Sequence, residues 1–118
     1  MSSEATPTTQ SPDRELTELH HVAIVTKDVA ATIRWYTKTF ECEVRYEDET
    51  WGLLKFANAF LAIVTEGQHP PHVGFVVSDA GEWGELKEHR DGTKSLYIAD
   101  DAANSVESLA DNEALRQL

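Results

Sequence analysis

Apolar and polar positions alternate along residues 19–26 (LHHVAIVT), a segment rich in β-branched side chains. Alternation with a period of two is typical of a β-strand. It places His21 and Ala23 on one face of the strand and His20 and Val22 on the other. The segment therefore predicts a first strand whose two histidines point in opposite directions.

The spacing becomes helical after this strand. Asp28 suits the N-terminal cap of a helix. Apolar side chains then follow at intervals of three or four residues, the stripe of an amphipathic helix: Val29, Ile33, Tyr36 and Phe40. Three further runs have strand composition, at residues 44–46, 51–56 and 60–65. The first half of the chain therefore predicts a βαβββ unit.

The opening of this unit recurs in the second half of the chain. HVAIVTKD at residues 21–28 matches HVGFVVSD at residues 72–79, and NAFLAI at 58–63 is echoed by NSVESL at 104–109. Self-similarity of this kind indicates two copies of one supersecondary unit.

The two copies are unequal in length. We expect module one at residues 19–66 and module two at residues 71–110. In module two, residues 80–91 must supply both a helix and a strand, and two glycines weaken the helix, so we expect only a turn or two. One sheet face then lacks a cover, which a helix within residues 101–118 or a partner subunit would supply.

The ends of the chain differ in composition from its centre. Residues 1–16 are mainly Ser, Thr, Pro and acidic residues, which predicts a disordered polar tail. The remainder, residues 17–118, suits one domain, because 118 residues with 41% apolar positions are too few for two. About 100 residues bury a modest core, so pairing with a second copy would add stability.

Charge and cysteine content narrow the partners and the compartment. Twenty-one acidic against ten basic residues give a formal charge of −11, which disfavours a nucleic acid or an anionic membrane surface as partner. No apolar run approaches the roughly 18 residues of a membrane-spanning helix. The single cysteine, Cys42, cannot form an internal disulfide. We therefore expect a cytoplasmic protein.

Paired βαβββ modules that open with HVAIV and HVGFV, followed by HRDGTKSLYIADDAANSVE at residues 89–107, resemble the vicinal oxygen chelate superfamily. That superfamily includes glyoxalases, bleomycin-resistance proteins and extradiol dioxygenases. The resemblance covers residues 19–109 and implies an α+β fold in which the two modules curl a mixed sheet into an open cup. It also implies metal ligands on the first and last strands of the modules, at His21, Leu61, His72 and Glu107.

The chemistry of these positions fits a metal in part. His21 and His72 share strand faces with small residues, Ala23 and Gly74, which leaves room for a ligand. Leucine cannot bind a metal, so Leu61 leaves a site of two histidines and one glutamate. This donor set favours Fe(II), with Mn, Ni, Zn or Co as other possible ions. The alternatives are a degenerated site, or a Glu107 that is one solvated acid among many.

Further residues are candidates for the substrate site. Tyr97 stands ten residues before Glu107, as an active-site tyrosine does in the extradiol enzymes, and its hydroxyl could bind a substrate oxygen. The alternative is a tyrosine packed at a sheet edge. Trp51 and Leu53 should face the cup, where they could bind a flat substrate, or else lie in a dimer interface.

The other histidines, His20, His69 and His89, are assigned to ordinary surface or core positions. His89 could serve as an acid or base only if the shortened module folds it inward.

The resemblance implies a metal-dependent, dioxygenase-like enzyme acting on a small oxygenated or aromatic substrate. The alternatives are a lyase or isomerase of the glyoxalase or epimerase kind, and a non-catalytic protein that binds an antibiotic-type small molecule, like the bleomycin-resistance members. The expected partners are the small molecule and a second copy of the chain in a homodimer.

Overall fold

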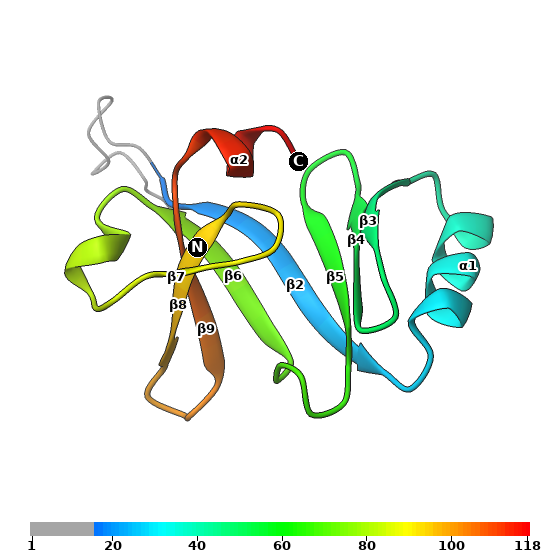
Figure 1. The fold of residues 1–118 in the computed structure, drawn as a ribbon, viewed down its shortest axis with the longest axis horizontal. Coiled ribbons are helices and arrows are strands. Elements are labelled where there is room, and N and C mark those ends of the chain that lie inside the picture. The colour runs from blue at the N-terminus through cyan, green and yellow to red at the C-terminus, as the bar shows by residue number, and fades with distance from the viewer. Residues whose placement is uncertain (1–15) are drawn as a thin grey trace, which may run out of the picture.

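The computed structural model describes residues 16–118, so the polar tail expected at residues 1–16 lies outside the described part except for Leu16. Within that part, eight strands form one mixed sheet in the order β3-β4-β5-β2-β6-β9-β8-β7 (Figure 1). The strands are β2 (Glu18–Thr26), β3 (Glu43–Glu47), β4 (Trp51–Lys55), β5 (Phe60–Thr65), β6 (His72–Val77), β7 (Lys87–Glu88), β8 (Lys94–Ala99) and β9 (Ser105–Ala110). The helical segments are α1 (Val29–Thr39), the 3-10 turn η2 (Ala80–Glu82) and α2 (Glu113–Arg116).

Module one has the predicted βαβββ order. Asp28 caps α1, and its Oδ1 accepts a hydrogen bond of 3.0 Å from the backbone N–H of Ala31. The apolar stripe of α1 then covers one face of the sheet, where Ile33 packs against Leu54 and Ile63. Leu54 and Ile63 are completely buried, so this outer face holds the core of the module.

Module two is the shortened copy that the sequence predicts. Only η2 stands where α1 stands in module one. Trp83, which follows η2, is 48% exposed. The outer face of module two is thus covered by a short turn and a loop rather than by a helix.

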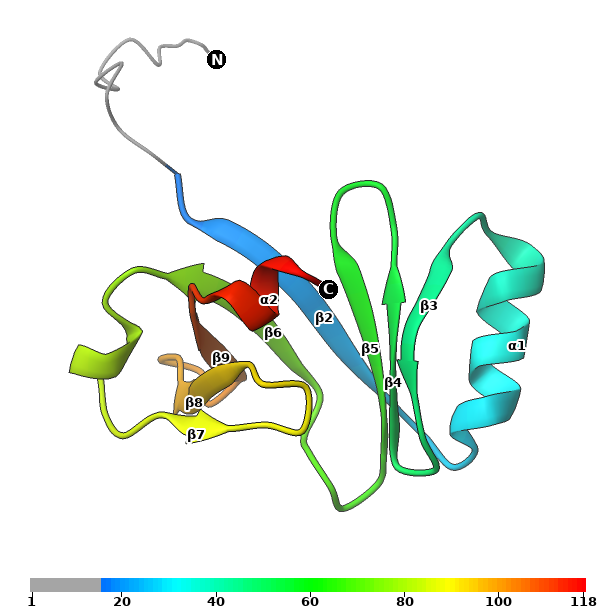
Figure 2. The same cartoon turned by 45° about the horizontal axis from the view of Figure 1, so that its top comes forward.

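The two modules join through their first strands. β2 runs antiparallel to β6, and each of these strands also pairs in parallel with the last strand of its own module, β2 with β5 and β6 with β9. The sheet curls around this central pair (Figure 2). One chain therefore builds the whole cup.

The helix near the C-terminus lies on a different face from the one expected. Leu115 packs against Val76 and Leu109, and Leu118 also packs against Leu53 and its neighbours, on the face opposite α1. α2 therefore covers the concave side of the sheet. The outer face of module two is still covered only by η2 and the loop that follows it. Across residues 16–118, no helix is long and apolar enough to cross a bilayer.

The core beneath α1 makes a testable prediction. Replacing Leu54 with Ala removes a fully buried side chain and should lower the free energy of unfolding by about 2–5 kcal/mol. Leu19→Ala is the matched control, because Leu19 is 44% exposed and should cost less than about 1 kcal/mol. Chemical denaturation of both variants measures the difference, and equal losses would contradict the assignment of the core.

Candidate metal centre

Strand register aligns the candidate ligands on the concave face. Glu107 on β9 lies opposite Gly74 on β6, and Gly74 lies opposite His21 on β2. Tyr97 on β8 completes the row opposite Glu107. Since residues that pair directly across a sheet point to the same side, this row projects into the cup.

Gly74 makes space for the His21 ring. A Cβ atom at position 74 would lie 2.7 Å from Nδ1 and 2.8 Å from Nε2 of His21. No side chain fits within that space, so the imidazole lies across the β6 backbone and reaches toward β9. The glycine thereby brings together donors from strands that are not adjacent.

Three donor atoms converge at the centre of the row. Nε2 of His21 and Nε2 of His72 each lie 3.0 Å from Oε1 of Glu107, and the two nitrogens are 3.1 Å apart. All three residues are at least 93% buried. Among the residues described, they form the one group of three that could hold a metal ion.

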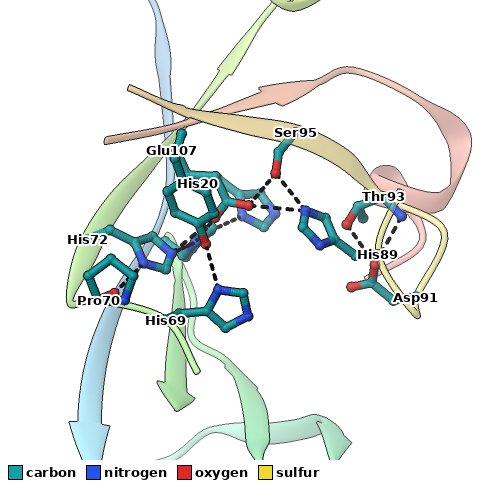
Figure 3. Close-up of polar contacts among 11 residues, drawn as sticks. His20, His69, Pro70, His72, His89, Asp91, Thr93, Ser95 and Glu107 are labelled. Carbon is teal, nitrogen blue, oxygen red and sulfur yellow. Dashed lines mark hydrogen bonds and ion pairs between the residues drawn. The ribbon is translucent and has the colours of Figure 1, made fainter. Parts of the chain in front are cut away.

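The contact of His72 with the backbone fixes which of its ring nitrogens carries the proton in the neutral ring. Its Nδ1 lies 2.8 Å from the backbone carbonyl of Pro70 (Figure 3), and a carbonyl only accepts, so Nδ1 carries the proton. In the neutral ring Nε2 then has a lone pair, directed at a carboxylate oxygen 3.0 Å away. Two acceptors at this distance repel unless a positive centre lies between them. One proton can lie between only two of the three donor atoms, whereas a divalent ion can bind all three together.

The spacing of the donors fits a particular coordination geometry. Ligands at about 2.1 Å from a metal are roughly 3.0 Å apart when they subtend right angles, and roughly 3.4 Å apart in a tetrahedron. The observed separations of 3.0, 3.0 and 3.1 Å match one face of an octahedron. Such an arrangement leaves other positions open for substrate or water.

The second carboxylate oxygen of Glu107 is held apart from the cluster. The Ser95 hydroxyl donates a 2.6 Å hydrogen bond to Oε2, and Nε2 of His89 lies 2.6 Å from the same hydroxyl and 3.5 Å from Oε2 (Figure 3). Burial opposes ionisation of Glu107, but the nitrogens of His21, His72 and His89 around its carboxylate favour the anion wherever they carry a proton, and the net effect lowers its pKa. The hydrogen bond to Glu107 raises the pKa of His89, against the effect of its burial. Glu107 is therefore an anion with one oxygen directed at the candidate metal position.

A bulge in β2 corrects the expected position of His20. The pairing with β6 shifts between Leu19 and His21, so both histidines lie on the concave side. Nδ1 of His20 is 2.8 Å from Nδ1 of His21, and its ring stacks on Phe60. Burial, followed by the charge of His21, lowers the pKa of His20 to about 4. Strict alternation cannot reveal such a bulge, because one inserted residue changes which face a side chain occupies.

A cavity of about 370 Å³ opens above the cluster, a size suited to a small ligand. All five histidines of the chain line it, and they are joined by Tyr97, Trp51 and Leu53. Leu115 and Leu118 add apolar surface from the α2 side. Trp51 and Leu53 therefore face the cup, as expected.

A loop of module two folds over this cavity. Arg90 forms a 2.5 Å ion pair with Asp48 of module one, and its guanidinium lies over the Trp51 ring. The same loop carries His89 inward to the cavity wall, which is the alternative that the sequence left open for this residue. His69 is also drawn in, with Nδ1 3.4 Å from the Tyr97 hydroxyl.

The sequence matches the family model described as Glyoxalase/Bleomycin resistance protein/Dioxygenase superfamily over residues 18–93. The chain belongs to this superfamily. None of the curated proteins matches the sequence.

Solved structures with the same fold extend over most of the chain. A hypothetical protein from Bacillus halodurans C-125 has a TM-score of 0.67 at 10% identity, covering 84% of this chain and 97% of its own. A Streptomyces coelicolor methylmalonyl-CoA epimerase variant in complex with 2-nitronate-propionyl-CoA has a TM-score of 0.66 at 17% identity, covering 81% and 98%. A superfamily member from Vibrio splendidus 12B01 has a TM-score of 0.61 at 11% identity, covering 81% and 100%.

The fourth ligand position taken from the superfamily needs a correction. Leu61 packs in the outer core beneath α1 and does not face the cup. The residues of β5 that face the cup beside His21 and Ala23 are Phe60 and Ala62. Neither can bind a metal, so the described site still offers three protein ligands.

The glycine under His21 leads to a prediction on metal affinity. Gly74→Ala should displace the His21 ring and weaken metal binding at least tenfold, because one of three ligands leaves its position. Gly81→Ala is the matched control, since a Cβ atom there meets only Leu86 at 3.7 Å. Calorimetric titration of the metal-free variants with Mn²⁺ measures both affinities. Unchanged binding by Gly74→Ala would show that His21 is not a ligand.

The Ser95 hydroxyl supports a second prediction. Ser95→Ala releases Oε2 of Glu107 and should reduce metal affinity about 10-fold or more. Ser108→Ala is the control, because the Ser108 hydroxyl is equally buried, lies one residue after Glu107 and has no hydrogen-bond partner among the described residues. The same titration compares them, and equal affinities would rule out a role for Ser95 in orienting the carboxylate.

Proposed function

We propose that this protein is a metal-dependent enzyme of the vicinal oxygen chelate type that acts on a small oxygenated or aromatic compound. His21, His72 and Glu107 hold the metal, with Fe(II) as the favoured ion and Mn, Ni, Co or Zn as alternatives. The observation that carries the proposal is the convergence of three buried donor atoms within 3.0 to 3.1 Å of one another, the Nε2 atoms of His21 and His72 and Oε1 of Glu107. A divalent cation satisfies all three donors at once.

The reaction we favour is dioxygenase-like. Two histidines and one carboxylate on one face of an octahedron are the ligand set of non-haem Fe(II) oxygenases. When bound, the metal supplies Lewis acidity to two adjacent oxygens of the substrate and stabilises the anion that forms.

The side chains around the metal have separate roles in this proposal. Burial and the negative charge of Glu107 raise the pKa of Tyr97, so its hydroxyl remains a donor that can bind a substrate oxygen. Trp51 and Leu53 contact the flat, apolar part of the substrate. Leu115 and Leu118 narrow the cavity from the α2 side and exclude water.

A lyase or isomerase is the second candidate, and His89 is the observation that favours it. This imidazole is half-buried at the cavity wall, and its hydrogen bond with Glu107 raises its pKa. A histidine in that position could move a proton at a carbon atom beside a chelated oxygen. The third candidate is a protein that binds a small molecule without catalysis.

Metal analysis separates the enzyme candidates from the third one. Protein purified without chelators should contain one transition-metal ion per chain, and His21→Ala should lose it because one of three ligands is gone. Glu66→Gln is the control, since Glu66 is a carboxylate outside the cavity lined by the histidines. Elemental analysis gives the metal content. Absence of stoichiometric metal, together with no submicromolar binding of Fe²⁺ or Mn²⁺, would overturn the enzyme proposal.

Two assays distinguish the reactions. Oxygen consumption by the Fe(II)-loaded protein with a panel of small catechols supports the dioxygenase. Exchange of carbon-bound hydrogen with solvent deuterium, seen by NMR with small 2-substituted carbonyl compounds, supports the isomerase.

We also propose a homodimer in the cytoplasm. The free thiol of Cys42 suits a reducing compartment, and the outer face of module two has no helix to cover it. Light scattering would measure the mass in solution.

A further inference from the structure

His20 has an environment that the ligand set does not explain. The residue is 95% buried. Burial of a polar ring away from water costs free energy unless the ring gains compensating contacts. The His20 ring stacks on Phe60 with ring centroids 4.7 Å apart, and it meets the His21 ring edge to face. Its one hydrogen bond among the described residues joins Nδ1 to Nδ1 of His21, at 2.8 Å.

This bond restricts the tautomers of both rings. Two ring nitrogens at 2.8 Å share one proton, so one ring donates and the other accepts. A metal on Nε2 of His21 requires a lone pair there, which places the proton of the neutral ring on Nδ1. His20 must then accept through Nδ1 and carry its own proton on Nε2.

We infer that His20 is a positioning residue of the candidate metal centre: its Nδ1 accepts the proton of His21 Nδ1 and so keeps His21 Nε2 directed at the metal. The inference rests on the proposed function. A partner on the second nitrogen of a metal-binding histidine fixes its tautomer and ring orientation, and losing such a partner costs 10–100-fold in affinity.

In module two, a backbone carbonyl is the hydrogen-bond partner of the second nitrogen of the metal-binding histidine. His72 Nδ1 donates to the carbonyl of Pro70. The residue that precedes His72 is Pro71, which is exposed and offers no side-chain acceptor. In module one no backbone carbonyl takes this role among the contacts of His21, and the bulge at His20 supplies an imidazole in its place.

Two substitutions at position 20 separate this role from simple packing. His20→Phe keeps the ring and its stacking on Phe60 but removes the acceptor. His20→Asn removes the ring but places an acceptor oxygen as many bonds from the backbone as Nδ1. His69→Phe is the control, because His69 lines the same cavity and contacts none of the three donor atoms.

Calorimetric titration of the metal-free proteins with Mn²⁺ tests the inference. We expect His20→Phe to bind at least 10-fold more weakly than the natural protein, and His20→Asn and His69→Phe to bind within about threefold of it. Equal affinity of His20→Phe and the natural protein would overturn the inference and leave the proposed function standing. If His20→Phe and His20→Asn bound Mn²⁺ equally weakly, the inference would also be overturned, because loss of packing rather than loss of the acceptor would then explain the weaker binding. No binding by the natural protein would overturn the proposed function and the inference together.

A spectroscopic measurement on the natural protein does not depend on the folding of any variant. In zinc-loaded protein labelled with ¹⁵N-histidine, long-range proton–nitrogen NMR correlations assign the ring protons. The inference expects the proton of His21 on Nδ1 and that of His20 on Nε2. A proton on Nδ1 of His20 would overturn it.

Discussion

The site depends on one electrostatic constraint: three electron-pair donors, on His21, His72 and Glu107, lie close together in the protein interior. In the neutral ring of His72, Nδ1 donates to the Pro70 carbonyl, which leaves Nε2 with a lone pair that faces the carboxylate of Glu107 at 3.0 Å. Unpaired acceptors in a low-dielectric interior are costly, so the arrangement requires a positive centre. A divalent ion meets this requirement for every donor, and for that reason the geometry carries more weight than the likeness of fold.

Several features of the fold hold the three donor side chains in position. Gly74 leaves the space that the His21 ring occupies, and Ser95 fixes the second oxygen of Glu107. The bulge in β2 adds a partner for His21. Each feature acts through orientation rather than through extra charge, and the candidate metal position borders the cavity.

The shortened second module has a consequence for the site. Where module one has helix α1, module two has a short turn followed by the loop that carries His89 and Arg90. This loop reaches across the cup to Asp48, and α2 lies over the same concave side. The shortened module therefore carries His89 to the cavity wall.

The sequence by itself determined the two βαβββ modules, the cap at Asp28 and the faces of His21 and His72, because repeats and strand alternation are local properties of the chain. It did not place His20, since a single bulged residue reverses the side of the sheet without changing the alternation around it. Nor did it place Leu61, His89 or α2, whose positions follow from strand register and from contacts between distant segments. The tertiary structure alone decided these, because pairing energies across strands and between modules, rather than local preference, select among the faces available.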